Sequence, residues 1–551
     1  MTNALYYGDN LAVLRESIKD ETVDLIYLDP PFNSNASYNV LFKALTGEQS
    51  QAQIEAFEDT WHWNEHAERA FDDVIQSGNT EAANMLNAMR SFLGENDMMA
   101  YLAMMAVRLI ELHRVLKPTG SLYLHCDPTA SHYLKVLLDA VFGPHVFRNE
   151  VIWKRTSSAN NPKRWGPVHD VLLFYTKTPD DYVWNKVLIA HDEDYLAIKY
   201  RHEDERGRYR LSDLTAAGKR GGDSGKPWHG FDPTPLGRHW GVPASIVAEF
   251  TDDAGHLTTQ QKLDLLDENN FIYWTPGRAG KPGFPQLKRH LAGGQNIQDV
   301  IDDIAPVNSM AKERLGYPTQ KPVELLERIV LASSNENEIV LDPFCGCGTA
   351  VHAAQKLHRQ WIGIDITHLA IGLIERRLKD AFPGIQFEVH GTPTDFAGAE
   401  DLAKRDKFQF QWWAVTLINA VPYGGKKKGA DSGIDGYYYC KPDGKKTEAG
   451  IVSVKGGDNL HSNMVDELRG VIEKEKAPLG VLITLREPTG PMVKAAATAG
   501  LFDTPFGKFQ RLQIATVGDM LDGKLPKLPP QEKGGGYKQA VPEKPGQERL
   551  I

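Results

Sequence analysis

The stretch of sequence that decides the fold is VDLIYLDPPF, which runs from Val23 to Phe32. Its first six residues form a nearly continuous apolar run, which is typical of a strand in a sheet covered on both faces. Asp29 follows this run and is kept out of helical geometry by Pro30, because proline restricts the residue before it to extended conformations. The sequence therefore predicts a buried strand that ends in a carboxylate and a proline carbonyl.

A second stretch, EIVLDPFCGCGT, runs from Glu338 to Thr349. Gly346 and Gly348 predict a tight turn that opens a helix, since glycine tolerates positive φ and lets a ligand approach the backbone. Asp342 ends the strand before this turn, and Asp365 ends the next strand along the chain. A carboxylate at a strand end beside a glycine turn is typical of nucleotide-binding sheets.

Strands and helices alternate on both sides of a long irregular segment. The alternation runs up to residue 177 and resumes at residue 323, whereas residues 178–308 are rich in Gly, Pro, Arg, Trp and Asp. This pattern predicts one doubly wound α/β domain, made of residues 1–177 and 309–400, into which residues 178–308 are inserted.

Two further segments follow this domain. Residues 401–522 combine amphipathic helices with apolar strands, which predicts a separate α/β domain. Residues 523–551 are rich in Lys, Pro, Gly and Gln, a composition that predicts a disordered tail. The chain has 551 residues, too many for one hydrophobic core, which agrees with several domains.

The composition is that of a globular protein, with 41% apolar and 24% charged residues. We expect a cytoplasmic protein with no membrane association, because no apolar run reaches the ~18 residues of a membrane span and the start lacks a signal-peptide pattern. The chain has four cysteines, which do not predict a disulfide framework. Cys345 and Cys347 alone make a weak metal site, so metal binding there is left open.

The net charge of −10 describes the whole chain, whereas binding to phosphate depends on local patches. Between residues 151 and 169, basic residues lie beside Trp153 and Trp165. The candidate nucleic-acid contacts in this segment are Lys154, Arg155, Lys163 and Arg164. A solvated charged surface is the alternative interpretation of this segment.

Together these stretches resemble the motifs of the amino-methylating DNA methyltransferases. Two more strings support the resemblance: YPTQKP at 317–322 precedes the glycine turn, and WIGID at 361–365 follows it. The catalytic motif comes first in the chain, as in the β group of that family. The resemblance implies a Rossmann-like methyltransferase sheet, S-adenosylmethionine as cofactor, double-stranded DNA as partner, and residues 178–308 as a target-recognition region. It leaves open a homodimer.

The resemblance also implies roles for single residues. Asp29 and the Pro30 carbonyl would accept the two N–H groups of a flipped base's exocyclic amine, and an aromatic ring would stack on that base. The catalytic residues implied are Asp29, Pro30, Pro31 and Phe32. The cofactor-binding residues implied are Asp9, Thr319, Lys321, Asp342, Phe344, Gly346, Gly348 and Asp365.

Aspartate at position 29 favours adenine as the target, because relatives that methylate the cytosine amine usually carry serine there. We therefore expect a site-specific adenine methyltransferase that forms N6-methyladenine and is related to restriction–modification systems. Methylation of the cytosine amine is the alternative, and RNA stays open as a substrate. A protein amide is disfavoured, since relatives that act on it usually carry asparagine. The target sequence is not given by these motifs.

Residues 401–522 resemble the PD-(D/E)xK nuclease fold of the Mrr-type restriction family. The matching residues are Asp435, Ser453 and Lys455. In that family two ligands hold a divalent metal such as Mg²⁺, and the lysine stabilises charge on the phosphate. Ser453 stands where a glutamate or glutamine is expected, and a hydroxyl is a poor Mg²⁺ ligand. A bifunctional methyltransferase and endonuclease is one alternative, and a non-catalytic DNA-binding or docking module is the other.

Overall fold

The computed structural model describes most of the chain. The described residues are 3–31, 37–41, 53–58, 62–156, 163–276, 283–291, 293–308, 310–317, 319–423, 433–531 and 539–543. They divide into two compact units, one formed by Met1–Lys186 with Gln298–Gln547 and the other by Val187–Ile297. Each unit is described by itself. Among these residues, no helix is both long and apolar enough to span a bilayer.

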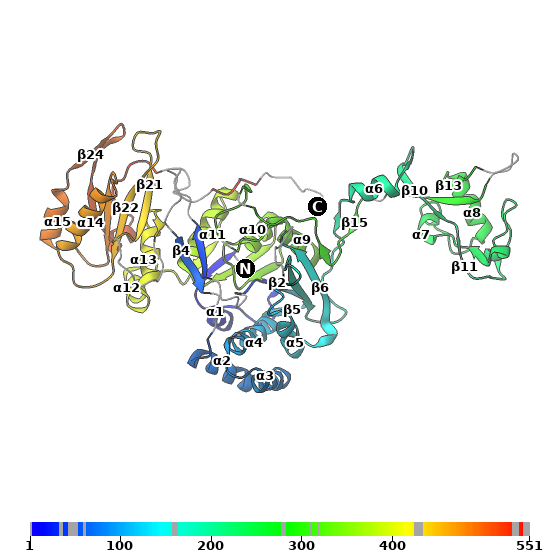
Figure 1. The fold of residues 1–551 in the computed structure, drawn as a ribbon, viewed down its shortest axis with the longest axis horizontal. Coiled ribbons are helices and arrows are strands. Elements are labelled where there is room, and N and C mark those ends of the chain that lie inside the picture. The colour runs from blue at the N-terminus through cyan, green and yellow to red at the C-terminus, as the bar shows by residue number, and fades with distance from the viewer. Residues whose placement is uncertain are drawn as a thin grey trace. The chain divides into compact units, whose positions relative to one another are not determined.

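A nine-stranded sheet forms the centre of the first unit (Figure 1). Its strand order is β16-β6-β7-β5-β2-β17-β18-β1-β19, and all pairs are parallel except those of β7. The strands are β1 (Ala4–Tyr7), β2 (Val23–Leu28), β5 (Leu116–Cys126), β6 (Phe147–Lys154), β7 (His169–Thr176), β16 (Val300–Ile301), β17 (Ile339–Asp342), β18 (Gln360–Asp365) and β19 (Glu388–His390). Strands from both halves of the chain meet in the middle, which confirms the predicted single α/β domain.

Both faces of this sheet are covered, as the apolar run in β2 predicts. Ile26 and Leu28 pack into the apolar cluster of one face, and Leu25 and Tyr27 into that of the other. The helices of the first cluster are α1 (Asn10–Ser17), α2 (Glu65–Gln76), α3 (Thr80–Leu93), α4 (Asp97–Val115) and α5 (Ser131–Phe142). The second cluster is covered by α9 (Val323–Ser333), α10 (Thr349–Lys356) and α11 (His368–Ala381). A short hairpin joins β3 (Ser37–Leu41) to β4 (Gln53–Glu58).

The unit Val187–Ile297 has its own small sheet and aromatic core. Strands β13-β14-β10-β9 form an antiparallel sheet, and Trp228, Trp240 and Leu263 are buried in its core. Its elements are β8 (Leu188–Ile189), α6 (Glu193–Lys199), β9 (His202–Asp204), β10 (Gly207–Asp213), β11 (Thr215–Ala217), β12 (Arg238–Trp240), α7 (Ala244–Val247), α8 (Thr259–Glu268), β13 (Ile272–Trp274), β14 (Pro285–His290) and β15 (Gln295–Asn296).

The predicted insertion, 178–308, is therefore too long at both ends. The Asn185 amide donates to the Ala332 carbonyl, 2.7 Å away, so this part of the chain still lies on the first unit. At the other end, β16 pairs with β6, and the Trp153 indole donates to the Ile304 carbonyl at 3.0 Å. Backbone pairing to the main sheet, which composition does not reveal, sets the boundaries at Val187 and Ile297.

The carboxy-terminal domain is built on a five-stranded mixed sheet, β20-β21-β22-β23-β26. The strands of this sheet are β20 (Val421–Pro422), β21 (Gly436–Cys440), β22 (Glu448–Lys455), β23 (Gly480–Thr484) and β26 (Leu512–Thr516). Two further strands of the domain, β24 (Leu501–Thr504) and β25 (Gly507–Gln510), pair with each other. Its helices are α12 (Phe396–Arg405), α13 (Lys407–Thr416), α14 (Asn463–Lys474), α15 (Gly490–Ala497) and α16 (Val517–Leu521). Because α12 packs into this domain's core, the domain begins before the predicted residue 401.

The prediction of a disordered tail over 523–551 is wrong for its described parts, 523–531 and 539–543. The Tyr438 hydroxyl donates to the Pro529 carbonyl at 3.0 Å, and the Gln513 amide donates to the Lys527 carbonyl at 2.6 Å. Further on, the Glu543 carboxylate lies 3.0 Å from the His352 ring. These contacts hold the segment on the folded chain despite its polar composition.

Candidate active site

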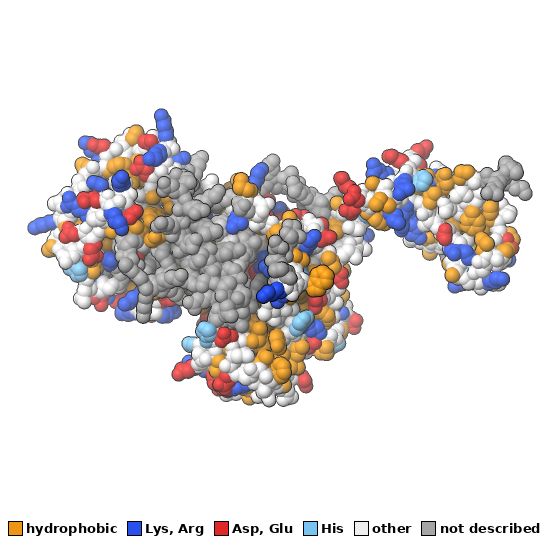
Figure 2. Space-filling view, in the orientation of Figure 1, with side chains coloured by type: hydrophobic (Ala, Val, Ile, Leu, Met, Phe, Trp, Pro, Cys, Tyr) orange, Lys and Arg blue, Asp and Glu red, His pale blue; other side chains and the backbone are white. Residues whose placement is uncertain are grey.

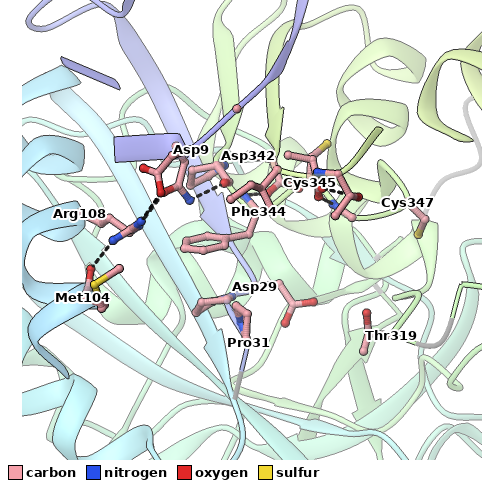
Figure 3. Close-up of a pocket in the computed structure, with 18 of the residues that line it drawn as sticks. Asp9, Asp29, Pro31, Met104, Arg108, Thr319, Asp342, Phe344, Cys345 and Cys347 are labelled. Atoms are coloured by element: carbon pink, nitrogen blue, oxygen red, sulfur yellow. Dashed lines mark hydrogen bonds and ion pairs between the residues drawn. The ribbon is translucent and has the colours of Figure 1, made fainter. Parts of the chain in front are cut away.

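A cavity of about 610 Å³ opens at the carboxyl ends of the central strands (Figure 3). Parallel strands end at one edge of a sheet, so the loops after β1, β2, β17 and β18 converge there. The predicted site residues that line it are Asp9, Asp29, Pro30, Pro31, Thr319, Lys321, Asp342, Phe344, Gly346 and Asp365. One cavity therefore brings together residues from both halves of the chain. Phe32 lies outside the described residues, and the structure tests nothing about it.

Asp29 lies at the end of β2 with its two carboxylate oxygens in different environments. Oδ2 accepts a hydrogen bond from the Lys321 ammonium, and both side chains are largely buried. Oδ1 is buried and accepts no hydrogen bond from the residues that the structure describes. The resemblance implied that Lys321 contacts the cofactor; in the structure it binds the carboxylate of Asp29. A buried polar atom without a hydrogen-bond partner costs free energy, so Oδ1 would favour a ligand that donates a hydrogen bond to it.

The glycine turn is held by the carboxylate of Asp365. The Gly346 amide donates to Asp365 Oδ2 at 2.9 Å, and the Thr367 amide donates to Oδ1 at 2.9 Å. Gly346 has φ +52° and Gly348 has φ +74°, which explains glycine at both positions. Burial raises the pKa of Asp365 to about 6. Oδ1 also accepts from the Thr367 hydroxyl at 2.9 Å, so only Oδ2 keeps a lone pair for a hydroxyl group of a ligand.

Besides Asp9, three carboxylates line this cavity, those of Asp29, Asp342 and Asp365. Burial raises the pKa of Asp342 well above its ordinary value, and the charges of Asp29 and Asp365 raise it further. Asp342 Oδ1 accepts from the Phe344 amide at 3.1 Å, while the Phe344 ring projects between Asp9 and Pro31 (Figure 3). A cavity with this charge pattern favours a cationic ligand, since a positive charge would restore the ionised form of Asp342.

The sequence did not reveal Arg108, which organises the far wall of the cavity. This arginine is 4% exposed and lies in an apolar run of helix α4, from Met98 to Ile110. Its guanidinium donates to Asp9 Oδ2 at 2.9 Å and to Asn10 Oδ1 at 2.6 Å (Figure 3). Asp9 also caps α1 by accepting from the Leu11 amide at 2.8 Å. The sequence feature that could have revealed Arg108 is a single charged residue within an apolar helical run. Such a charge must find a partner when it is buried.

The basic segment after β6 starts at the same sheet edge as Asp29. Arg155 lies 3.0 Å from Asp170, whose other oxygen is 3.3 Å from the ring of the buried His125. The opposite ring nitrogen of His125 is 2.8 Å from the Tyr27 hydroxyl, on the catalytic strand. The four predicted DNA-contacting residues, Lys154, Arg155, Lys163 and Arg164, are all exposed. A chain of polar contacts thus links this surface to β2.

In the carboxy-terminal domain, Asp435 and Ser453 do lie together. The Ser453 hydroxyl donates to Asp435 Oδ2 at 3.3 Å, and the Val454 amide donates to the same oxygen at 2.6 Å. Lys455 follows on the same strand. Among the residues that the structure describes, no three metal-ligating side chains are grouped. Glu448 begins β22, seven residues before Lys455 and roughly 23 Å away along the strand, so it lies at the wrong end to join them.

Comparison with known proteins agrees with this geometry. The family model described as DNA methylase matches residues 23–376, which include the Asp29 motif, the inserted unit and the glycine turn. The chain belongs to the DNA methylase family. The Asp29 motif and the glycine turn thus lie within the matched region of this methylase, whereas the carboxy-terminal domain lies outside it. The prediction of a DNA methyltransferase is confirmed, and that of an Mrr-type nuclease domain stays a prediction.

Individual relatives cover different shares of the methylase. This chain is 31% identical over 381 residues to the type II methyltransferase M.EcaI of Enterobacter cloacae, and the match covers 68% of this chain and 69% of the relative. It is 27% identical to the type III restriction-modification enzyme StyLTI Mod subunit of Salmonella typhimurium, covering 65% of this chain and 50% of the relative. A putative DNA modification methylase of Thermus thermophilus, solved with S-adenosyl-L-methionine, is 16% identical with a TM-score of 0.33, covering 70% of this chain and 97% of that one.

The glycine turn generates a first prediction. A Cβ at Gly346 would meet the Tyr317 ring at 3.3 Å, and the position has positive φ, so Gly346→Ala should destabilise the turn by about 1–3 kcal/mol. Thermal unfolding measures this loss. Gly470→Ala is the matched control, because that helical position has no atom within 4 Å of the new Cβ. Equal melting temperatures for the two variants would contradict the account.

Proposed function

We propose that this methylase transfers a methyl group from S-adenosylmethionine to the N6 amine of adenine in double-stranded DNA. The observation that carries the proposal is the asymmetric Asp29 carboxylate, held at Oδ2 by Lys321 and buried without a hydrogen bond from the described residues at Oδ1. Asp29 lines the same cavity as Gly346 of the glycine turn. An amine donor and a methyl donor would therefore meet in one enclosed space.

The residues present fit S-adenosylmethionine, which supplies an electrophilic methyl group. Its volume suits a cavity of about 610 Å³, within the range of roughly 300–1,000 Å³ typical of small-molecule sites. Asp342 would hold the ammonium group, because a nearby cation offsets the cost of ionising a buried carboxylate. Asp365 Oδ2 would accept a ribose hydroxyl, and Gly346 would lie along the methionyl part. Gly348, predicted to bind the cofactor, does not line the cavity and lies against Ile374. Cationic charge on the ligand suits the three carboxylates.

The chain's own groups account for activation of the amine. An exocyclic amine is a poor nucleophile because its lone pair is delocalised into the ring. Asp29 Oδ1 accepts one N–H and the Pro30 carbonyl accepts the other, which turns the lone pair out of the ring plane. Lys321 fixes the carboxylate so that Oδ1 faces the cavity. After transfer, Asp29 or a nearby water takes the proton that leaves the nitrogen.

Adenine and a restriction–modification context are the finer parts of the proposal. Aspartate at position 29 favours adenine. Among the relatives, one is named DNA adenine methyltransferase YhdJ, from Escherichia coli, which is 22% identical over 375 residues. Two others carry names from restriction–modification systems. These names describe the relatives and support the same activity for this chain. Methylation of the cytosine amine is the alternative product.

The unit Val187–Ile297 is proposed to recognise the target sequence. Lysine and arginine side chains gather on this unit in Figure 2. Arg208 and Arg210 alternate on β10, and Arg210 lies directly across from Arg289 on β14. Like charges opposite one another on a sheet destabilise it, and a bound phosphate backbone would relieve this repulsion.

The carboxy-terminal domain is proposed to have a nuclease-like fold with little or no cleavage activity. Asp435 Oδ2 already accepts from the Val454 amide and the Ser453 hydroxyl, and Ser453 supplies no carboxylate. Mg²⁺ prefers several hard oxygen ligands in octahedral geometry, so this pair is a poor site for it. A DNA-holding or docking role fits the domain better than cutting.

The experiment that tests the methylation proposal compares Asp29→Ala with the full wild-type chain. We expect N6-methyladenine in DNA treated with the wild type, measured by mass spectrometry of digested product. The variant should lose at least a hundredfold in rate, because it lacks the acceptor for the amine. Its calorimetric affinity for S-adenosylmethionine should stay within a few-fold of that of the wild type.

Asp127→Ala is the control, since that aspartate follows the neighbouring strand β5 but does not line the cavity. It should retain methylation. Methylcytosine without methyladenine would overturn the adenine assignment. Loss of cofactor affinity equal to the loss of rate would show that the role given to Asp29 is wrong.

Cofactor affinity should fall in acid. Asp365 has a pKa of about 6 and bears a negative charge above it, so protonation at low pH removes an attraction for a cationic ligand. Between pH 7.5 and pH 5.5 the dissociation constant should rise roughly fourfold, the inverse of the ionised fraction. Calorimetry at constant ionic strength measures it. Asp365→Asn should weaken the pH dependence, and an affinity unaffected by pH in the wild type would contradict the assignment.

Incubation of unmodified DNA with the wild-type chain and Mg²⁺ tests the nuclease proposal. We expect no cleavage above that of the paired variants Asp435→Ala and Lys455→Ala, because one metal ligand is missing. Cleavage by the wild type that disappears in both variants would instead establish the bifunctional enzyme. A contaminating nuclease would survive both changes, so the variants also control the assay.

A further inference from the structure

Helix α13 of the carboxy-terminal domain has two different apolar faces. Phe410 and Trp413 on one face are buried in the core of their own domain. A second stripe along the helix faces α11 beside the cavity. It consists of Gln409, Trp412 and Thr416, whose spacing places them on one side of the helix. The helix therefore packs against α11 of the methylase domain as well as against its own domain.

The polar contact in this stripe is made at the first turn of α11. Gln409 Oε1 accepts a hydrogen bond from the His368 amide at 3.0 Å, and both residues are buried. The first N–H groups of a helix have no partner within the helix, so a side chain or water must satisfy them. His368 stands three residues after Asp365, the carboxylate that holds the glycine turn.

The apolar contact reaches the turn itself. Trp412, 2% exposed, packs in one cluster with Leu369 of α11 and with Tyr317 and Cys347. Cys347 lies within the glycine turn, and the Tyr317 ring is the atom group nearest to a Cβ built on Gly346. The His368 ring also stacks on Tyr7, with ring centroids 3.6 Å apart, next to the loop that carries Asp9. Helix α13 thus contacts the start of α11 and packs in one cluster with a residue of the glycine turn.

We propose that α13 positions the cofactor-binding loops, with Gln409 and Trp412 as the positioning residues. The carboxy-terminal domain is then a structural part of the cofactor site. This inference rests on the proposed function, because it takes S-adenosylmethionine as the ligand. Gln409 touches neither cofactor nor DNA; it acts by keeping the start of α11, and with it Asp365 and Thr367, in the conformation that binds the ligand.

The test compares three full-length variants. Gln409→Met removes the acceptor and keeps the length of the side chain, Gln409→Glu keeps an acceptor, and Phe408→Ala alters a neighbouring residue that is 40% exposed. For Gln409→Met, the dissociation constant for S-adenosylmethionine should rise about five- to fiftyfold, as expected when a buried N–H loses its partner. Its kcat at saturating cofactor and its affinity for DNA should stay within twofold. The other two variants should bind the cofactor as the wild type does.

Several results would overturn the inference. One is an unchanged affinity of Gln409→Met for the cofactor, and another is a loss of cofactor affinity in Phe408→Ala equal to that in Gln409→Met. A fall in the kcat of Gln409→Met at unchanged cofactor affinity would also overturn it. If Gln409→Met does not fold, Trp412→Phe makes a smaller change to the same face and should weaken cofactor binding in the same direction. A wild-type chain that binds no S-adenosylmethionine would refute the proposed function itself, and the inference with it.

Discussion

A buried carboxylate needs a counter-charge, and in this methylase Lys321 supplies it to Asp29. The two residues are 292 positions apart, and each stands in its own half of the α/β domain. Removing a carboxylate from water costs several kcal/mol unless a partner compensates. The pair therefore forms only when both halves are folded together. It also breaks the symmetry of the carboxylate, because Oδ2 binds Lys321 and the buried Oδ1 accepts no hydrogen bond from the described residues.

Much of this arrangement could be predicted from the sequence because it is local. The apolar run before Asp29 and the glycines at 346 and 348 reflect constraints that act within a few residues, namely burial of a central strand and positive φ. The amphipathic helices and apolar strands expected within residues 401–522 were predictable for the same reason, and α13, α14, β22 and β23 are such elements.

What the sequence did not reveal depends on contacts between distant residues. Arg108 meets Asp9 across 99 positions, and nothing in its helix indicates that partner. The true limits of the inserted unit depend on β16 pairing with β6, and a two-residue strand leaves no pattern. Gln409 looks like an ordinary polar residue in a helix, and only its bond to the His368 amide gives it a role.

The order of the strands has a consequence for how the chain is made. Strand β2 is fully buried in the finished sheet, yet β17, its neighbour on one side, lies in the second half of the sequence. At about 5–20 residues per second, the roughly 300 residues between them take on the order of 15–60 seconds to synthesise. During that time β2 presents an apolar, unpaired edge, which is the kind of surface that promotes aggregation. The sheet of the methylase is complete only after β17, β18 and β19 have been synthesised, so until then the nascent chain exposes a surface that the finished fold buries.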